Sequence, residues 1–293
     1  MAICTLCPRK CGIDRSIKSG FCGCTDVLRV ARAAPHFWEE PCISGTDGSG
    51  AVFFSGCNLR CVFCQNKPLS YGYEGIDIDV SRLSDIFIEL QSKGVHNINL
   101  VTPTPWTDKI KAALDLAWQK GLWLPVVYNC GGYESVSALR SLSGYISVYL
   151  PDFKYMDCRL AERFSCAPDY PEAAKRALYE MVDQRGGAVF DENGIMTRGV
   201  IVRHLVLPGH TDDSMRVLDY LRSEYGDEIY ISIMNQYTPS PGMKGELSAP
   251  LSAEEYGLVV DYARKIGIKN GFIQEGETAK ESFIPVWDGT GVI

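Results

Sequence analysis

Short apolar runs alternate with longer amphipathic stretches along the chain, from about residue 50 to its end. Runs of this kind, rich in Val, Ile, Leu and Tyr and bounded by Gly, Pro, Asn or Asp, are typical of buried β-strands. The pattern predicts strands at Ala51–Phe54, Asn97–Val101, Leu124–Tyr128, Ile146–Leu150, Val200–Val206, Ile229–Met234 and Gly271–Gln274.

Helix start and stop signals fall between these runs. Asp79 is suited to cap a helix that ends near Gly94, and Ser252 with Glu255 forms a capping box for a helix that ends near Gly267. A further helix is predicted from apolar residues on one face followed by a glycine, namely Ile110, Leu114, Ala117, Trp118 and then Gly121.

This alternation of strands and helices predicts an α/β protein whose parallel sheet closes, partly or almost completely, into a (β/α) barrel. In that architecture the chemistry gathers at the carboxyl ends of the strands. We divide the chain into a short Cys-rich metal-binding appendage at residues 1–45 and a barrel domain at residues 46–293. The segment 155–199 is longer than an ordinary connection and contains a helix-like run, Ala174–Gln184, so we interpret it as a lid or a docking surface.

Composition and charge limit the kinds of partner and the cellular compartment that we expect. The net charge of −7 and the lack of a Lys/Arg-rich block argue against a nucleic-acid partner. No apolar run approaches the length that crosses a bilayer, and the first ten residues lack an apolar signal, so we expect a cytoplasmic protein with no membrane partner. Because the cytoplasm is reducing, we interpret the twelve cysteines as metal ligands or buried apolar residues in preference to disulfide partners.

Three cysteines lie close together just after the first predicted strand. The stretch "SGCNLRCVFCQN" contains Cys57, Cys61 and Cys64. A tetrahedral zinc site needs four ligands and a disulfide needs two. Three thiolates, in contrast, can hold three irons of a [4Fe–4S] cube and leave the fourth iron open to a small molecule. The alternative is that these thiols are inert and buried, which the full CxxxCxxC spacing on a loop after a strand disfavours.

The residues "CNLRCVFC" resemble the CxxxCxφC motif of the radical SAM superfamily, with Phe63 in the aromatic position. Longer stretches, among them "HFWEEPCISGTDGSGAVFFSGCNLRCVFCQN", "YLPDFKYMD" and "RHLVLPG", resemble the pyruvate formate-lyase activating enzyme-like branch and its uncharacterised Fe–S proteins. The resemblance spans nearly the whole chain. It implies that the open iron binds S-adenosylmethionine and that one electron splits the sulfonium. The resulting 5′-deoxyadenosyl radical then takes a hydrogen atom from a substrate.

The resemblance also implies partners. The expected substrate is a backbone glycine of a glycyl radical enzyme, and the expected electron donor is flavodoxin or ferredoxin. Two alternatives stay open: the same radical acts on a peptide or a small molecule, or the chain is a non-catalytic Fe–S or zinc binding module. A fourth cysteine within ligand distance of the Cys57 loop would favour the binding module.

Several polar residues follow the predicted strands and so fall at the expected active edge. Asp152 and Lys154 are two residues apart, so on an extended segment they face the same side. They match a DxK pair that, in the activating enzymes, contacts the methionyl part of the cofactor. The alternative is that they form only a local ion pair. Thr102 begins "TPTP", at the position where the superfamily commonly has Gly-Gly-Glu-Pro. A contact with the cofactor's amino group would therefore have to come from the backbone carbonyls of this stretch. The alternative is that the two prolines only end the strand.

Two later strands contribute further candidates. Asn129 follows the third strand in a turn related to that of the activating enzymes, although Tyr128 and Cys130 depart from their pattern. Only one of Arg203 and His204 can point inward, and we favour Arg203 beside the cofactor's carboxylate or ribose.

The N-terminal segment "CTLCPRKC" begins a second set of thiols. Cys4, Cys7, Cys11 and Cys22 can close a zinc site, which would stabilise a segment too short for its own core. The same four can instead ligate a second Fe–S cluster that passes electrons inward, and Cys24 can replace Cys22. We favour zinc because the segment is short and its spacing irregular.

Overall fold

The computed structural model describes residues 3–240, 242–274 and 285–293. Its central sheet contains parallel strands that pair in chain order, which confirms the predicted parallel α/β organisation. These strands are β2 (Ser49–Phe54), β4 (Ile98–Val101), β5 (Val126–Cys130), β6 (Val148–Pro151), β8 (Met196–Leu205), β9 (Tyr230–Met234) and β10 (Gly271–Ile273). Each of the predicted strands corresponds to one of them, with ends that differ by up to four residues.

Three additional strands are antiparallel. β1 (Arg29–His36) pairs with β2, β3 (Ile76–Asp77) pairs with β1, and β7 (Val189–Phe190) pairs with the start of β8. The sequence pattern missed β1 because arginines interrupt its apolar residues. Residues 29–44 therefore belong with the sheet, and the segment that precedes the first strand ends at Leu28 rather than near residue 45.

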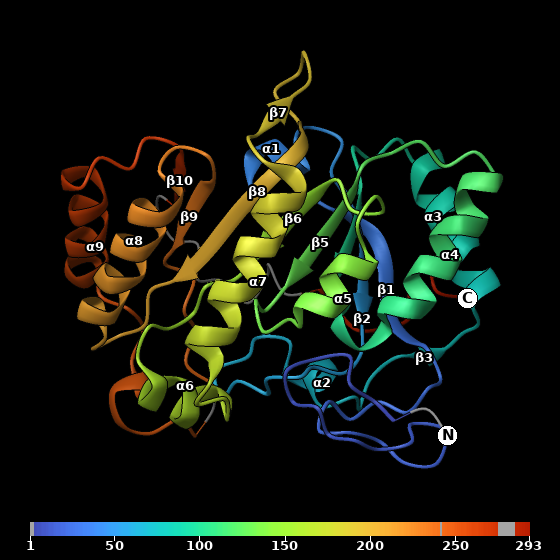
Figure 1. Cartoon of the computed structure of the whole chain (residues 1–293), viewed down its shortest axis with the longest axis horizontal. Helices are drawn as coiled ribbons and strands as arrows, with labels where there is room; N and C mark the ends of the chain where they lie inside the picture. The colour runs from blue at the N-terminus through green and yellow to red at the C-terminus, as the bar shows by residue number, and fades with distance from the viewer. Residues whose placement is uncertain (1–2, 241, 275–284) are drawn as a thin grey trace.

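The sheet is an open, partial barrel. Its hydrogen-bonded path runs from β10 at one edge to β3 at the other, and no pairing between these edge strands closes it within the described ranges. The arrowheads of β5 and β8 point toward the side where the N-terminal segment, α2 (Lys67–Ser70) and α6 (Cys158–Ser165) lie (Figure 1). The carboxyl ends of the strands thus share one mouth.

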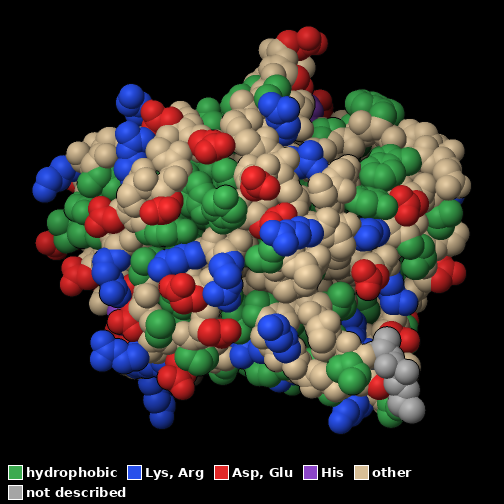
Figure 2. Space-filling view, viewed as in Figure 1, with side chains coloured by type: hydrophobic (Ala, Val, Ile, Leu, Met, Phe, Trp, Pro, Cys, Tyr) green, Lys and Arg blue, Asp and Glu red, His purple; other side chains and the backbone are tan. Residues whose placement is uncertain are grey.

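Helices cover the outer face of the sheet (Figure 1). Asp79 caps α3 (Val80–Ser92) by accepting from the Arg82 N–H, and Ser252 and Glu255 form the predicted capping box of α9 (Ala253–Lys265). The outward helix faces mix acidic and basic side chains (Figure 2), as solvated surfaces do. The described part of the chain also contains α1 (Pro41–Ser44), α4 (Thr107–Gln119), α5 (Val136–Ser141), α7 (Tyr170–Arg185) and α8 (Thr211–Tyr225), with 3-10 turns at Thr104–Trp106 and Gly245–Ser248.

The long segment 155–199 divides into two parts. α7 contains the predicted run Ala174–Gln184 and buries one face, including Ala177 and Met181, so it is a crossover helix of the barrel. α6 instead lies at the mouth. None of the helices in the described ranges is long and apolar enough to traverse a bilayer.

Residues 3–28 form no helix or strand, and arginines attach them to the mouth. Arg9 donates to the backbone carbonyls of Asn58 (2.8 Å) and Ser165 (3.1 Å). The Arg15 guanidinium lies over the Trp106 ring, 4.9 Å from its centroid. These contacts hold the Cys-rich segment against the carboxyl ends of the strands.

Candidate functional site

The three-cysteine loop leaves β2 through a turn that needs glycine. Gly56 has φ +88°, and a Cβ there would meet the Cys24 sulfur at 1.9 Å. The loop is then fixed by the Asn58 side chain, which donates to the Tyr133 carbonyl at 2.6 Å, and by a turn in which the Cys64 N–H donates to the Cys61 carbonyl at 3.1 Å. A short, well-anchored loop therefore presents the thiols.

The structure brings the three thiols together around one ammonium group. Burial raises the pKa of Cys57 to about 11, with a further rise from the Cys61 thiol. Burial raises the pKa of Cys64 to about 12, and the thiols of Cys61 and Cys57 add to the rise. The Lys154 ammonium opposes the rise at Cys57 and Cys61. Cys61, Cys64 and Lys154 also border one cavity, which places the ammonium group beside these two thiols.

A buried hydroxyl relay touches one of these thiols. The Ser165 Oγ, at the end of α6, lies 2.9 Å from the Cys61 Sγ and 2.9 Å from the Tyr155 hydroxyl oxygen. Ser165 has no exposed surface. When Tyr155 donates to Ser165, the serine proton is left to point at the Cys61 sulfur. This contact could not be predicted from the sequence, because Ser165 is distant from the thiol motif along the chain.

A charged cluster lies beside the thiols, inside the barrel. Arg203 donates from Nε to Asp152 Oδ1 (3.1 Å) and from Nη1 to Glu39 Oε2 (3.1 Å), while its Nη2 donates to the Asn129 side chain. Asp152 Oδ2 accepts from Lys154 Nζ at 2.6 Å. Asp152 and Lys154 thus form the local ion pair considered from sequence, and that pair also faces the thiols.

These charges stabilise one another despite burial. Burial alone would raise the pKa of the Asp152 carboxyl, but the Lys154 and Arg203 charges outweigh it and hold that pKa below its usual value. Burial likewise opposes charge on Lys154, and the Asp152 carboxylate overcomes it and raises the Lys154 pKa. The cluster therefore keeps Asp152, Lys154 and Arg203 ionised at neutral pH.

One cavity of about 230 Å³ joins the thiols of Cys61 and Cys64 to the charged cluster, and Cys57 is not among its lining residues. The predicted residues Cys61, Phe63, Cys64, Asn129, Asp152, Lys154 and Arg203 line it. Glu39 also lines it, and the sequence reasoning missed this residue. The only available signal was a pair of adjacent glutamates, Glu39 and Glu40, inside an otherwise apolar stretch.

Two other candidates lie off this cavity. Thr102 adopts φ +59°, an unusual value for a residue with a side chain, and its N–H donates to the Asn129 carbonyl at 2.9 Å, but it is not among the lining residues. His204 points away from Arg203, with Nδ1 2.8 Å from the Phe153 carbonyl oxygen. Of the two neighbours on β8, Arg203 is the one that enters the lumen.

The N-terminal thiols line a separate, smaller cavity. Cys4, Cys7, Cys11 and Cys22 all border a space of about 20 Å³, together with Asn58 of the three-cysteine loop. In the described part of the chain, no three Cys, His, Asp or Glu side chains converge closely enough to share a single metal ion. Cys24 does not border this space: its thiol hydrogen-bonds to the Cys22 side chain, lies 3.4 Å from the Ser55 carbonyl oxygen and packs against Gly56.

Comparison with known proteins finds a sequence relative and solved structures with the same fold. No protein-family model matches the chain. An uncharacterized protein of Methanocaldococcus jannaschii, MJ0674, is 28% identical over 277 residues, covering 90% of this chain and 75% of the relative.

Solved structures share the fold at low sequence identity. HydG, a maturase of the [FeFe]-hydrogenase, has a TM-score of 0.53 at 14% identity, over 78% of this chain and 51% of its own. Streptococcus suis SuiB bound to precursor peptide SuiA has a TM-score of 0.51 at 14% identity, over 75% and 47%. anSMEcpe with bound AdoMet has a TM-score of 0.50 at 15% identity, over 72% and 57%. The chain thus spans about half the length of these structures and has their partial-barrel fold.

A buried glutamate near the mouth generates a pH prediction. Glu134 accepts from the Thr104 hydroxyl (2.6 Å) and the Tyr128 hydroxyl (3.2 Å), and burial raises its pKa to about 7. A folded-state pKa above the unfolded value contributes stability at low pH that is lost as pH rises toward 7. Between pH 5 and pH 8, wild type should therefore lose about 2–3 kcal/mol of unfolding free energy relative to Glu134→Gln.

Urea unfolding at a series of pH values measures this difference. Glu89→Gln is the matched control, because Glu89 is largely exposed and its pKa is lowered by the hydrogen bond from Arg82. The control should show no such loss between pH 5 and pH 8. A pH-independent difference between wild type and Glu134→Gln contradicts the assignment.

Proposed function

We propose that this chain is a radical SAM enzyme. The observation that carries the proposal is the set of three thiols on the loop after β2, at the carboxyl mouth of a partial barrel. Two of them, Cys61 and Cys64, border a cavity that holds a charged cluster. The shared fold with HydG, SuiB and anSMEcpe supports it, and anSMEcpe was solved with bound AdoMet.

The donor set fits a [4Fe–4S] cluster held by three thiolates. Cys57, Cys61 and Cys64 supply soft sulfur ligands, and the Lys154 ammonium beside them offsets the negative charge that thiolates and cluster would carry. The thiols of Cys61 and Cys64 border the lumen cavity, and Cys24 does not. This arrangement supports a cluster that Cys57, Cys61 and Cys64 would hold at the edge of the lumen cavity.

The charged cluster is suited to hold an amino acid group. S-adenosylmethionine carries an ammonium and a carboxylate, and the lumen offers both cations, Lys154 and Arg203, and carboxylates, Asp152 and Glu39. Their side chains are at most 19% exposed, so they exclude water from the reacting centre. When bound, the reduced cluster supplies one electron that breaks the sulfonium S–C5′ bond, giving methionine and a carbon radical that takes a hydrogen atom from the substrate.

A polypeptide is the substrate class that the cavity rim favours. The cavity extends from the thiols to Trp38 and Pro285, and Phe37, Trp38 and Val286 expose more than half of their surface nearby. Exposed apolar residues of this kind are typical of binding surfaces. SuiB was solved with a precursor peptide bound. We therefore propose hydrogen abstraction from a polypeptide, with a glycine of a glycyl radical enzyme as the first candidate.

The proposal is tested by cleavage of S-adenosylmethionine. Anaerobically reconstituted protein, reduced with dithionite, should release 5′-deoxyadenosine, and Cys61→Ala should abolish the release because the cluster loses a ligand. Cys24→Ala and Cys158→Ala are matched controls that should retain it. Absence of 5′-deoxyadenosine from iron-loaded wild type would instead support a non-catalytic Fe–S module. With a candidate partner, a glycyl EPR doublet distinguishes activation from modification of a peptide.

The hydroxyl relay at Cys61 generates a second prediction. Hydrogen bonds to cluster sulfurs stabilise the more negative, reduced state and raise the reduction potential. Ser165→Ala should therefore lower the midpoint potential of the cluster, measured by EPR-monitored redox titration. Tyr155→Phe should shift the potential in the same direction by less, because it removes only the donor to Ser165. An unchanged potential in Ser165→Ala contradicts a tuning role, and the exposed Ser143→Ala is the control.

A further inference from the structure

The three-cysteine loop contains an arginine in an unusual backbone conformation. Arg60 lies between Cys57 and Cys61 and has φ +59°, in the left-handed region that favours glycine. A residue with a side chain is unfavourable in that region unless the surrounding structure holds it there. The function proposed above gives Arg60 no role, so the contacts that hold it call for an explanation.

Aromatic rings hold the Arg60 side chain. Its guanidinium carbon lies 4.8 Å from the centroid of the Phe21 ring and 5.2 Å from the centroid of the Tyr71 ring. Both distances fall within the range of a cation–π contact. The Arg60 Nε–H is buried and has no hydrogen-bond partner in the described part of the chain. The two ring faces, rather than a hydrogen bond from Nε, therefore fix the guanidinium.

Arg60 belongs to a longer column of stacked groups. The Arg9 guanidinium lies 4.0 Å from the Phe21 centroid and 5.2 Å from the Tyr133 centroid. Arg9 also donates to the Asn58 carbonyl of the three-cysteine loop. Phe21 thus joins two guanidinium groups, one that is part of the loop and one that binds the loop backbone. The stacked column comprises Tyr133, Arg9, Phe21, Arg60 and Tyr71.

A glycine of the N-terminal segment makes room for the column. Gly23 has φ +79°, and a Cβ there would meet the Tyr71 carbonyl oxygen at 2.7 Å. The same Cβ would lie 3.8 Å from Arg60 Nη2. The backbone at Gly23 therefore packs directly against Tyr71, beside the guanidinium, and any larger residue would push the segment away from this contact.

The backbone at Arg60 acts on a proposed cluster ligand. The Leu59 N–H donates to the Cys57 sulfur at 3.4 Å, and the Arg60 N–H donates to the same sulfur. Burial raises the pKa of Cys57, and these two N–H groups oppose that rise because they stabilise the thiolate. Successive N–H groups beside a left-handed residue form a concave anion site, as in many Fe–S proteins. A change of φ at Arg60 would turn these N–H groups relative to Cys61.

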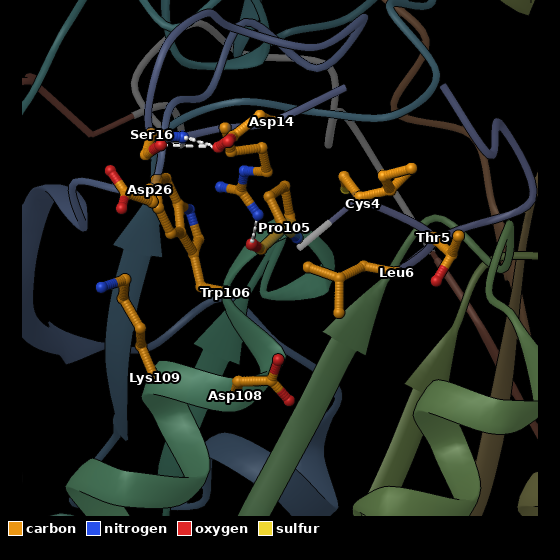
Figure 3. A pocket seen from close by; sticks show the side chains of 12 residues that line it. Cys4, Thr5, Leu6, Asp14, Ser16, Asp26, Pro105, Trp106, Asp108 and Lys109 are labelled. Carbon is orange, nitrogen blue, oxygen red and sulfur yellow. Dashed lines mark hydrogen bonds between the residues drawn. The ribbon is translucent and has the colours of Figure 1, made fainter. Parts of the chain in front are cut away.

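A similar stacked arginine lies elsewhere in the N-terminal segment. The Arg15 guanidinium lies 4.9 Å from the Trp106 centroid and donates to the Pro105 carbonyl at 2.5 Å. Pro105 and Trp106 lie at a cleft of about 520 Å³ between the N-terminal segment and the start of α4 (Figure 3). These contacts join the segment to the barrel rather than to the three-cysteine loop, so Arg15 is the matched control for Arg60.

We propose that Arg60 is a positioning residue for the cluster on the three-cysteine loop. Stacked on the Phe21 and Tyr71 rings, its guanidinium holds the left-handed turn. The turn in turn keeps two backbone N–H groups on the Cys57 sulfur. Hydrogen bonds to ligand sulfurs raise the reduction potential of a cluster, so the stacked column makes the cluster easier to reduce. The effect on the potential rests on the function proposed above, whereas the position of the loop does not.

Midpoint potentials of the anaerobically reconstituted full chain, from EPR-monitored redox titration, test the effect on the cluster. Arg60→Gln should lower the potential, and Phe21→Leu should also lower it although the Arg60 charge remains. Arg60→Lys should lower it by less, because the charge is kept and only the planar stack is lost. Arg15→Gln should leave it unchanged. A lower potential in Arg60→Gln but not in Phe21→Leu would mean that charge alone acts, and it overturns the positioning role, as does no shift in either variant.

Hydrogen exchange of the metal-free full chain tests the loop without a cluster. Phe21→Leu should speed backbone exchange several-fold in a peptide that spans residues 57–64, because the loop opens more often. Slow exchange of β5 shows that the variant is folded, and Tyr71→Leu serves if Phe21→Leu is not. Arg15→Gln should match wild type at residues 57–64. Unchanged exchange there in a folded variant overturns the proposal. If the loop loosens as expected but wild type binds no iron, the positioning of the thiols stands and the proposed function fails.

Discussion

The site depends on a buried guanidinium. Arg203 bridges Asp152 after β6 and Glu39 after β1 and contacts Asn129 on β5, so one side chain joins elements from across the barrel. Removing one partner of such a buried pair typically costs about 3–5 kcal/mol because the remaining charge is left uncompensated. Asp152 in turn holds Lys154 toward the thiols. The Lys154 ammonium therefore lies beside Cys57 and Cys61 because Asp152, itself paired with Arg203, holds it there.

That balance also explains why the barrel is polar at its centre. Interiors of small barrels are ordinarily filled with apolar side chains. Here charged and amide groups from four separate segments meet beside a cavity of about 230 Å³. Such a cluster is costly unless a ligand with both charges uses it, and the amino acid end of S-adenosylmethionine has both. Lumen, thiols and cavity are therefore parts of one proposed site, to which the N-terminal segment adds a second set of thiols.

The sequence predicted the parallel strands, the capping of α3 and α9, and the partial barrel, because these follow from local periodicity and cap residues. It also predicted the charged residues Asp152, Lys154 and Arg203 that line the cavity, because side chains after parallel strands meet at one mouth. The sequence did not predict Glu39, Ser165 or Tyr155 as residues of the site.

These residues reach the site through contacts between distant segments. Glu39 reaches the lumen only because β1 joins the sheet in an antiparallel pairing, and Ser165 reaches Cys61 only through the packing of α6. Contacts between segments so far apart carry no local signal.

The central claim is that one iron of a cluster on the three-cysteine loop is open to S-adenosylmethionine. The most direct measurement is the EPR spectrum of the reconstituted and reduced protein, recorded before and after S-adenosylmethionine is added, with Cys61→Ala as the control that should lack the cluster signal. The account predicts a change in the g values as the amino and carboxylate groups bind the open iron. A spectrum that stays the same at saturating S-adenosylmethionine would mean that the iron is already fully ligated and would contradict the account.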